Sequence, residues 1–284
     1  MTITVEAIRE LQESHVVEQA NRNVRLMSGD KSAVIALPDH YTTHDLEKFL
    51  PLRRRARGRM STTAMRDFVA YSLIHREPGA TIFIDANKMR AVGVLNLGQP
   101  DAAGHADNQA VLELEQTAAY KALRQACSGH KSQATLAEFL EDWPDAVQAF
   151  AGTEQLAAPK AIAAIRKITI ESLRKLESEE QQLSATRSAF ESVAATSTEK
   201  LPTHLYFNCV PYAGLSERQF VLRLQIHTGD KAPSLSLRMV NEELHAEQMA
   251  QELCALLRSQ CQAATDVIEA EPMQVLIGSY SAAA

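Results

Sequence analysis

Aromatic residues and long apolar runs are both scarce in this sequence. Only 5% of the 284 residues are Phe, Trp or Tyr, so any core must be built mainly from Leu, Ile, Val, Ala and Met. No window approaches the roughly 18 consecutive apolar residues that a membrane span requires. Residues 1–19 carry Glu6, Glu10 and Glu13 and lack the basic head and apolar stretch of a signal peptide. We therefore expect a cytoplasmic protein with no membrane partner.

Cysteine is sparse as well. Cys127, Cys209, Cys254 and Cys261 are widely separated, and no pair has the C-x-x-C spacing of redox and zinc motifs. Cys254 and Cys261 fall on one face of a predicted helix, two turns apart, which is too far for a disulfide within a straight helix. We expect four thiols that stay reduced in the cytoplasm.

The motifs of common catalytic sites are absent. The sequence contains no G-x-S-x-G, no phosphate-binding P-loop, no G-x-G-x-x-G and no H-E-x-x-H. The net charge of −6 excludes a uniformly basic surface but leaves room for one local basic patch. We therefore expect no cofactor, and a protein that is not an enzyme is favoured over one that is.

Hydrophobic periodicity predicts a mixed first half. A helix is expected over residues 3–27, followed by a short buried strand. Thr62 or Thr63 should cap a helix with an apolar stripe at Met65, Phe68, Val69 and Leu73. The remaining elements of this half are a strand at 81–85, a turn at 86–88, a return strand at 89–97, a third strand at 110–115, a helix at 117–127 and a helix capped by Ser132.

The second half reads as β-rich with a C-terminal helix. Residues 157–195 are ambiguous: 167–171 alternate like a strand, and the conformation of 173–195 is not predicted. Strands are expected at 205–210, 219–227 and 235–240, a helix from Asn241 to about Gln262, and a last apolar piece at 275–277. The predicted fold is α+β, with an antiparallel meander followed by helices and a second antiparallel sheet packed with the C-terminal helix. The halves are 1–155 and 156–284, as two domains or one continuous domain.

Several separated stretches resemble the YfdQ-type family of phage and prophage proteins. They are Phe83-Ile84-Asp85-Ala86, Gly104-His105-Ala106-Asp107-Asn108, Ala137-Glu138-Phe139-Leu140-Glu141-Asp142-Trp143 and Arg187-Ser188-Ala189, together with the β-rich second half. The resemblance covers roughly residues 30–260. It implies a phage-encoded protein in the host cytoplasm, and it carries no functional residue over to this chain.

The most unusual local feature is a run of five arginines in seven residues: Arg53, Arg54, Arg55, Arg57 and Arg59. Such charges repel one another unless anions or carboxylates neutralise them. Because arginine binds phosphate with two nitrogens at once, the run predicts a strip that contacts a phosphate backbone. The alternative is an exposed strand or loop that pairs with carboxylates, within the subunit or across an oligomer interface. No aromatic residue lies within the run to stack on bases.

Asp85, His105 and Asp107 form a second polar set. Asp85 ends a predicted strand and the other two precede the next one, so the three side chains could converge. A hydrolytic metal site needs three or more protein ligands, whereas Asp also belongs in turns, where it bonds to nearby backbone amides. The favoured interpretation is turns and caps without a metal, with metal or acid/base chemistry as the alternative.

These observations leave two main hypotheses. The first is a homo-oligomeric phage protein that handles nucleic acid, with single-stranded DNA as its partner. The strand order from Thr81 to Cys127 is similar to the core of single-strand annealing proteins, which is fold-level analogy only. The second is a structural or host-interaction protein with the arginines at a subunit interface. Strands 205–210 and 219–227 lack a proline that would guard their edges, which favours self-association. An enzyme built on Asp85, His105 and Asp107 is the third hypothesis.

Overall fold

The structure is a computed structural model, and it divides the chain into two units, Met1–Arg55 and Ala56–Ala284. In the first unit, residues 12–19 are helical, within the helix predicted over 3–27. The short buried strand predicted after this helix, at residues 33–37, lies outside the described residues. The residues that the structure describes are 4–5, 9, 12–19, 22, 49, 51–53, 55–168, 200–227, 234–268 and 272–281.

The first sheet of the second unit is mixed. Its five strands, in spatial order, are β1 (Gly58–Thr62), β6 (Asn108–Glu113), β3 (Arg90–Val94), β2 (Thr81–Asp85) and β12 (Gln274–Ile277). The central strands β6, β3 and β2 pair antiparallel, which confirms the predicted meander. The two edge strands β1 and β12 pair parallel to their neighbours. A small hairpin, β4 (Gly98–Gln99) and β5 (Ala102–Ala103), lies in the loop between β3 and β6.

Two helices cover one face of this sheet. They are α2 (Met65–His75) and α8 (Glu242–Ile268), which contact each other and the strands. Phe68 of α2 is fully buried, as are Ile82 and Ile84 of β2, so the predicted stripe of α2 does face the core. The predicted cap was wrong: Ala64 occupies the cap position without a side-chain bond, and Thr62 Oγ1 accepts from Ala64 N at 3.1 Å.

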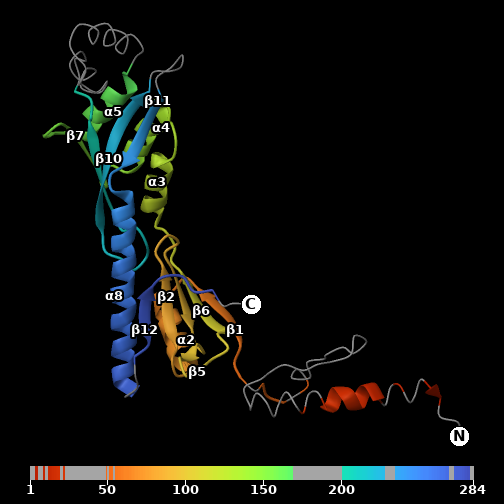
Figure 1. Ribbon diagram of the computed structural model, residues 1–284. Helices are drawn as coiled ribbons and strands as arrows, with labels where there is room; N and C mark the ends of the chain where they lie inside the picture. Colours follow the sequence, from red (N-terminus) through yellow and green to blue (C-terminus); the bar gives the residue numbers. More distant parts are fainter. Residues whose placement is uncertain are drawn as a thin grey trace. The chain divides into compact units, whose positions relative to one another are not determined.

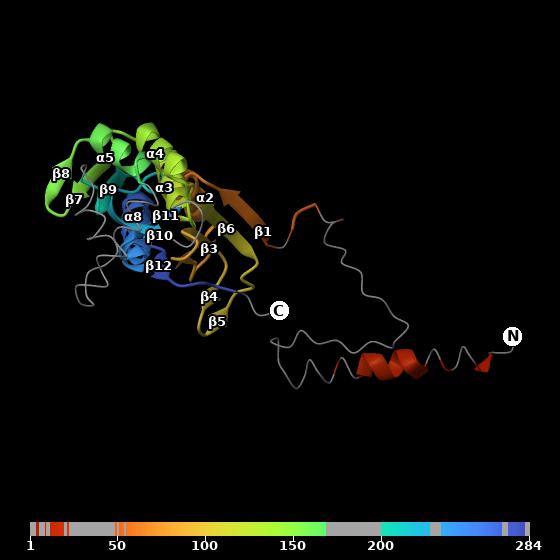
Figure 2. The same cartoon turned by 90° about the horizontal axis from the view of Figure 1, so that it is seen from above.

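The second sheet is antiparallel throughout. Its strands, in order, are β11 (Ser234–Met239), β10 (Arg218–His227), β9 (His204–Cys209), β7 (Val147–Ala151) and β8 (Glu154–Leu156). Three helices, α3 (Ala118–Cys127), α4 (Gln133–Asp142) and α5 (Ala158–Arg166), lie on one side of it (Figure 2). Ring contacts join Tyr120 to Phe220 and Phe139 to Phe207 on this covered face.

The opposite side of the second sheet, which we call the outer face, follows from the alternation of side chains along each strand. Every second residue of β10 from Phe220 to Leu224 is buried, and the residues between them point the other way. The strand residues of the outer face are Gln148, Phe150, Gln155, His204, Tyr206, Asn208, Gln219, Val221, Arg223, Gln225, His227, Ser234, Ser236 and Arg238.

Helix α8 connects the two sheets. It starts directly after β11, where His245 contacts Phe220 of β10, and it continues to β12 of the first sheet (Figure 1). Near its far end, the guanidinium of Arg258 donates to the carbonyl oxygen of Val275, with Nη2 at 2.7 Å. One continuous buried cluster includes side chains from both sheets and from α8. The α+β class predicted from the sequence is confirmed.

The other elements of the second unit agree closely with their predictions. Thr117 and Ser132 cap α3 and α4, with their hydroxyls accepting from Tyr120 N and Thr135 N. Strands β9, β10 and β11 lie where the alternation placed them. Strands β7 and β8 were not predicted, and the division predicted between residues 155 and 156 falls within β8. Helix α5 ends at Arg166, while residues 169–199, which include 173–195, lie outside the described residues.

The prediction that residues 205–210 and 219–227 form unguarded edge strands was wrong. Strands β9 and β10 are interior strands, each paired on both sides, so neither presents an edge. The edge strands of the second sheet are β11 and β8, and β8 is only three residues long. At the β11 edge, Lys131 already exchanges backbone hydrogen bonds with Leu235. Self-association must therefore be argued from another surface.

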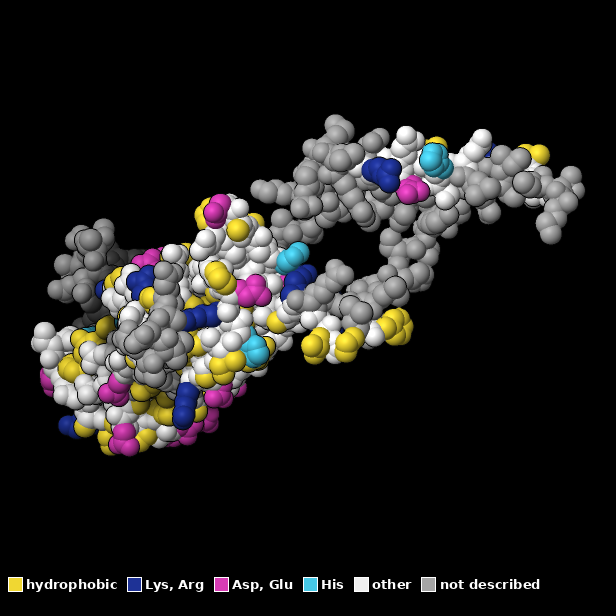
Figure 3. Space-filling view, turned by 90° about the horizontal axis from the view of Figure 1, so that it is seen from below, with side chains coloured by type: hydrophobic (Ala, Val, Ile, Leu, Met, Phe, Trp, Pro, Cys, Tyr) yellow, Lys and Arg dark blue, Asp and Glu magenta, His cyan; other side chains and the backbone are white. Residues whose placement is uncertain are grey.

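The surface is mixed in charge. In Figure 3, acidic and basic side chains are scattered over the visible side of the second unit, in agreement with the prediction that the surface is not uniformly basic. Within the described part of the chain, no helix is long and apolar enough to cross a membrane.

Candidate functional site

The arginine run crosses the division between the two units. Arg53 and Arg55 belong to the first unit, and Arg57 and Arg59 belong to the second. Arg53 and Arg57 are exposed, Arg55 is half-buried, and Arg54 lies outside the described residues. The part of the run that the second unit positions is therefore Arg57 and Arg59.

Strand β1 holds the end of the run in an extended conformation at the edge of the first sheet. Gly58 N donates to the carbonyl oxygen of Asp107 at 2.9 Å, and β1 then pairs in parallel with β6 as far as Thr62. Gly58 has a φ of 136°, which a residue with a Cβ adopts only under strain. Nothing lies within 4 Å of the place where its Cβ would be, so the backbone here is open to close approach.

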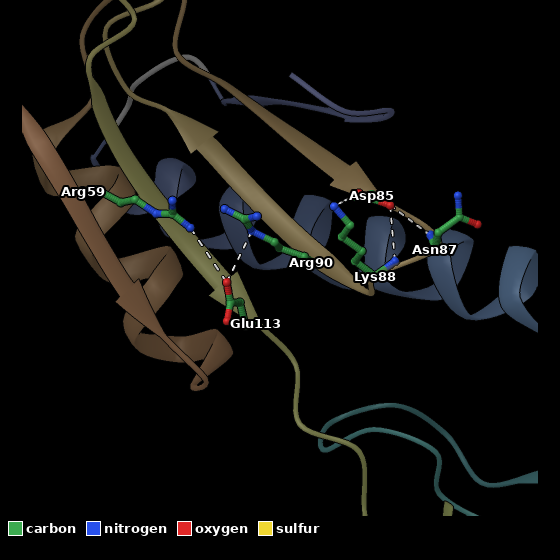
Figure 4. A network of polar contacts seen from close by, with 6 residues as sticks. All are labelled: Arg59, Asp85, Asn87, Lys88, Arg90 and Glu113. Carbon is green, nitrogen blue, oxygen red and sulfur yellow. Dashed lines mark hydrogen bonds and ion pairs between the residues drawn. The ribbon is translucent and has the colours of Figure 1, made fainter. Parts of the chain in front are cut away.

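Arg59 and Arg90 share one carboxylate on the face of the first sheet opposite α2 and α8 (Figure 4). Arg59 Nη2 lies 3.8 Å and Arg90 Nε 3.5 Å from Glu113 Oε1. The strand register produces this group, because Arg90 is directly opposite both Asp85 and Glu113. Arg59 and Glu113 are each more than half exposed, so these pairs contribute little to stability. Two guanidinium groups against one carboxylate leave the group with a net positive charge.

Asp85 organises the turn between β2 and β3, as the sequence predicted. Its Oδ1 accepts from Asn87 N at 3.1 Å and from Lys88 N at 3.3 Å, and Lys88 Nζ lies 3.9 Å from its Oδ2 (Figure 4). These bonds satisfy the carboxylate locally. The turn is completed by Met89, which has a positive φ of 47°.

His105 and Asp107 do not join Asp85. Asp85 pairs with Arg90 at the end of the sheet where β6 finishes, whereas His105 and Asp107 precede the start of β6 at the opposite end. The three side chains therefore do not converge, because antiparallel register separates them by the length of the strands. His105 is exposed. Among the described residues, no group of three or more His, Cys, Asp or Glu side chains is arranged to hold a metal ion.

Asn96 is the residue that fixes the loop before β6, and the sequence analysis missed it. Its side chain is almost fully buried, with Nδ2 donating to Asp107 Oδ1 at 2.9 Å and Oδ1 accepting from Asn108 N at 3.0 Å. A Cβ at Gly104 would lie 2.0 Å from the carbonyl oxygen of Asn96. The 104–108 motif is therefore explained by loop construction. Only the contact between residues 96 and 108, which are distant in the sequence, reveals it.

Comparison with known proteins decides the family. The family model described as "Uncharacterized conserved protein (DUF2303)" matches residues 7–278, which is nearly the whole chain. The chain belongs to the DUF2303 family. No curated protein and no solved structure matches it. The description of the DUF2303 family names no activity, so function is argued from the chain's own residues.

The cysteines of this DUF2303 chain are free thiols, and most of them are buried. All four cysteines are free, and Cys209, Cys254 and Cys261 are buried. Burial raises the pKa of Cys209 to about 12 and that of Cys127 to about 11. Since the thiolate is the nucleophile, the raised pKa values favour the protonated, less reactive form of Cys127 and Cys209 at neutral pH. The expectation of free thiols is confirmed.

Proposed function

We propose that this protein handles nucleic acid by binding the phosphates of single-stranded DNA along the arginine run. The observation that carries the proposal is the net positive charge of the group formed by Arg59, Arg90 and Glu113 beside β1. The exposed Arg57 leads into this edge strand, and Glu113 is the shared partner of both Arg59 and Arg90. A phosphate can displace a carboxylate from a solvent-exposed pair at small cost.

The backbone of β1 supports the same function. Arginine contacts phosphate through a planar fork of donors. This contact needs the DNA backbone to come close to β1. Gly58 leaves the backbone between Arg57 and Arg59 uncovered by any side chain of its own. Arg59 on β1 and Arg57 just before it therefore offer donors to neighbouring phosphates of a DNA backbone.

The resemblance to the YfdQ-type family adds a setting to this proposal. A phage-encoded protein that acts in the host cytoplasm meets single-stranded DNA during replication and recombination of the phage genome. We include homo-oligomeric assembly in the proposal, because several copies of a short arginine strip would together follow a longer strand.

An assembly function for the arginines is the second candidate. Arg59 already pairs with a carboxylate, and the outer edge of β1 is unpaired in the described sheet. A neighbouring copy, or a host protein, could supply further carboxylates to the run. The protein would then be structural, with no DNA partner.

Salt dependence of binding separates the two candidates. Three to five arginine contacts to a single strand give a slope of log K against log salt of roughly −2 to −3.5. The double change Arg57→Ala/Arg59→Ala should weaken binding of a fluorescein-labelled oligothymidylate and flatten the slope by about 1.4. Fluorescence anisotropy over a salt series measures both quantities.

The matched control removes two exposed lysines on α3 and α5. Lys121→Ala/Lys160→Ala makes the same change in net charge away from β1, and it should leave the slope close to that of the parent. Equal flattening in both variants would mean that only net charge matters. Loss of assembly in the arginine variant, with no DNA binding by the parent, would instead support the assembly function.

A further inference from the structure

The outer face of the second sheet differs from the chain as a whole in its charged residues. None of its strand residues is Asp or Glu, although the chain carries a net charge of −6. Its two charged residues are Arg223 and Arg238, and both are exposed. The described strand positions of this face therefore carry no carboxylate, across all five strands. Such a surface is electrostatically complementary to a polyanion.

The two arginines lie directly opposite each other on β10 and β11. Like charges at directly opposed positions of an antiparallel pair destabilise the sheet. Neither arginine has an ion-pair partner among the described residues. The second sheet therefore tolerates an unrelieved repulsion at its surface, which a bound anion would remove.

Aromatic rings continue the same row of the sheet. Arg223 is also directly opposite His204 of β9, and His204 is directly opposite Phe150 of β7. The rings of Phe150 and His204 are nearly parallel, with centroids 5.4 Å apart, and Tyr206 packs edge-on at 5.0 Å from Phe150. All three residues are half-buried, so each remains partly accessible to solvent. The row places an aromatic surface beside two guanidinium groups.

Together these features form the platform that the arginine run lacks. Unpaired bases stack on aromatic side chains, and neighbouring arginines hold the phosphates between them. A sheet face with adjacent rings and cations suits an extended single strand, whereas duplex DNA keeps its bases stacked inside and offers mainly phosphates. We infer that the outer face is a second binding surface for single-stranded DNA, with bases on Phe150 and Tyr206 and phosphates on Arg223 and Arg238. This inference rests on the proposed function, and it adds a base-contacting surface to it.

The test removes the ring faces while retaining apolar volume. Phe150→Leu/Tyr206→Leu should raise the Kd for labelled oligothymidylate about tenfold or more and leave the salt slope unchanged. Arg223→Gln/Arg238→Gln should flatten that slope by about 1.4. The matched control is Phe83→Leu/Tyr280→Leu, which removes a stacked pair of rings from the first sheet, and it should bind like the parent. Circular dichroism and thermal unfolding confirm that each variant is folded.

The outcomes distinguish the two proposals. If the parent binds, and if binding weakens in Arg57→Ala/Arg59→Ala but not in the outer-face variants, only the proposal of a second binding surface is overturned. Weakening by the outer-face variants alone would support this surface and remove the arginine run from the function. No binding of oligothymidylate by the parent would overturn both, and equally tight binding of duplex DNA would overturn the base contacts.

Discussion

Arg218 of β10 and Glu252 of α8 form the least exposed ion pair of the described residues, at 2.7 Å, with side chains 17% and 19% exposed. Glu252 also accepts from the backbone N of Ser216 at 2.6 Å, and Gln248 accepts from Arg218 at 3.1 Å. Burial alone would raise the pKa of Glu252, but the hydrogen bonds from Arg218 and Ser216 outweigh it and lower the pKa. The pair therefore ties the N-terminal half of α8 to the second sheet.

We expect Glu252→Gln to reduce the free energy of unfolding by about 1–3 kcal/mol at neutral pH, because it leaves Arg218 without its carboxylate. Since the pKa of Glu252 is lowered on folding, the stabilisation is present above the usual value of 4.5. It is lost as the pH falls through the lowered pKa. The difference between parent and variant in urea unfolding should thus shrink towards zero in acid.

The control for this prediction is an exposed pair of the same kind. Arg166 and Glu141 lie 2.8 Å apart, with side chains 53% and 44% exposed. Glu141→Gln should cost no more than about 1 kcal/mol, because solvent screens the pair. Equal costs at the two sites would contradict a special contribution from burial.

At the scale of elements, the link between the two sheets depends on the segment before α3. Gln116 pairs with Tyr212 in an isolated bridge, and Thr117 N donates to the carbonyl oxygen of Pro211 at 3.0 Å. The Thr117 hydroxyl caps α3 and also donates to the carbonyl oxygen of Val210. One side chain therefore serves both the helix and its attachment to the second sheet.

We expect Thr117→Ala to cost about 2–3 kcal/mol, since it removes a cap and leaves the Val210 carbonyl without a partner. Ser132→Ala removes only the cap of α4, where Ser132 Oγ accepts from Thr135 N at 3.1 Å, and it should cost about 1 kcal/mol. Chemical denaturation compares the two variants. A larger loss for Ser132→Ala would show that the Val210 contact contributes nothing.

At the scale of the whole molecule, β1 is the strand best placed for self-association. Gly58 N points towards β6, and because backbone groups alternate along a strand, the N–H groups of Arg59 and Ser61 point to the free edge. The charge of Arg59 on β1 disfavours non-specific pairing of another strand at this edge. A second copy could add to the sheet here only if the charge of Arg59 is accommodated.

We predict that the protein sediments as a defined homo-oligomer, and that Ser61→Pro shifts it towards monomer. Proline removes an outward N–H without disturbing the bonds to β6, so the fold should survive. Analytical ultracentrifugation with circular dichroism measures both. A monomeric parent at micromolar concentration would overturn the prediction, and an intact oligomer in Ser61→Pro would place the interface elsewhere.

Local sequence patterns were sufficient to predict most helices and strands, but they did not predict which elements pair or pack together. The alternation in β10 and the spacing of apolar residues in α4 are properties of adjacent residues, so the sequence alone predicts them. Strand β7 was missed because Val147–Ala151 is short and its alternation carries little polarity. The arginine run was found by composition, whereas its partner Glu113 depends on the pairing of β1 with β6.

The amino-acid sequence by itself determined the α+β class, the caps of α3 and α4, the free thiols and the position of the basic run, because each depends on residue type and short-range spacing. Only the tertiary structure decided that Asp85 lies apart from His105 and Asp107, that β9 and β10 are interior, and that Phe150, His204, Arg223 and Arg238 form one row. Strand order and register bring together residues that are distant in the chain, and no local pattern specifies them.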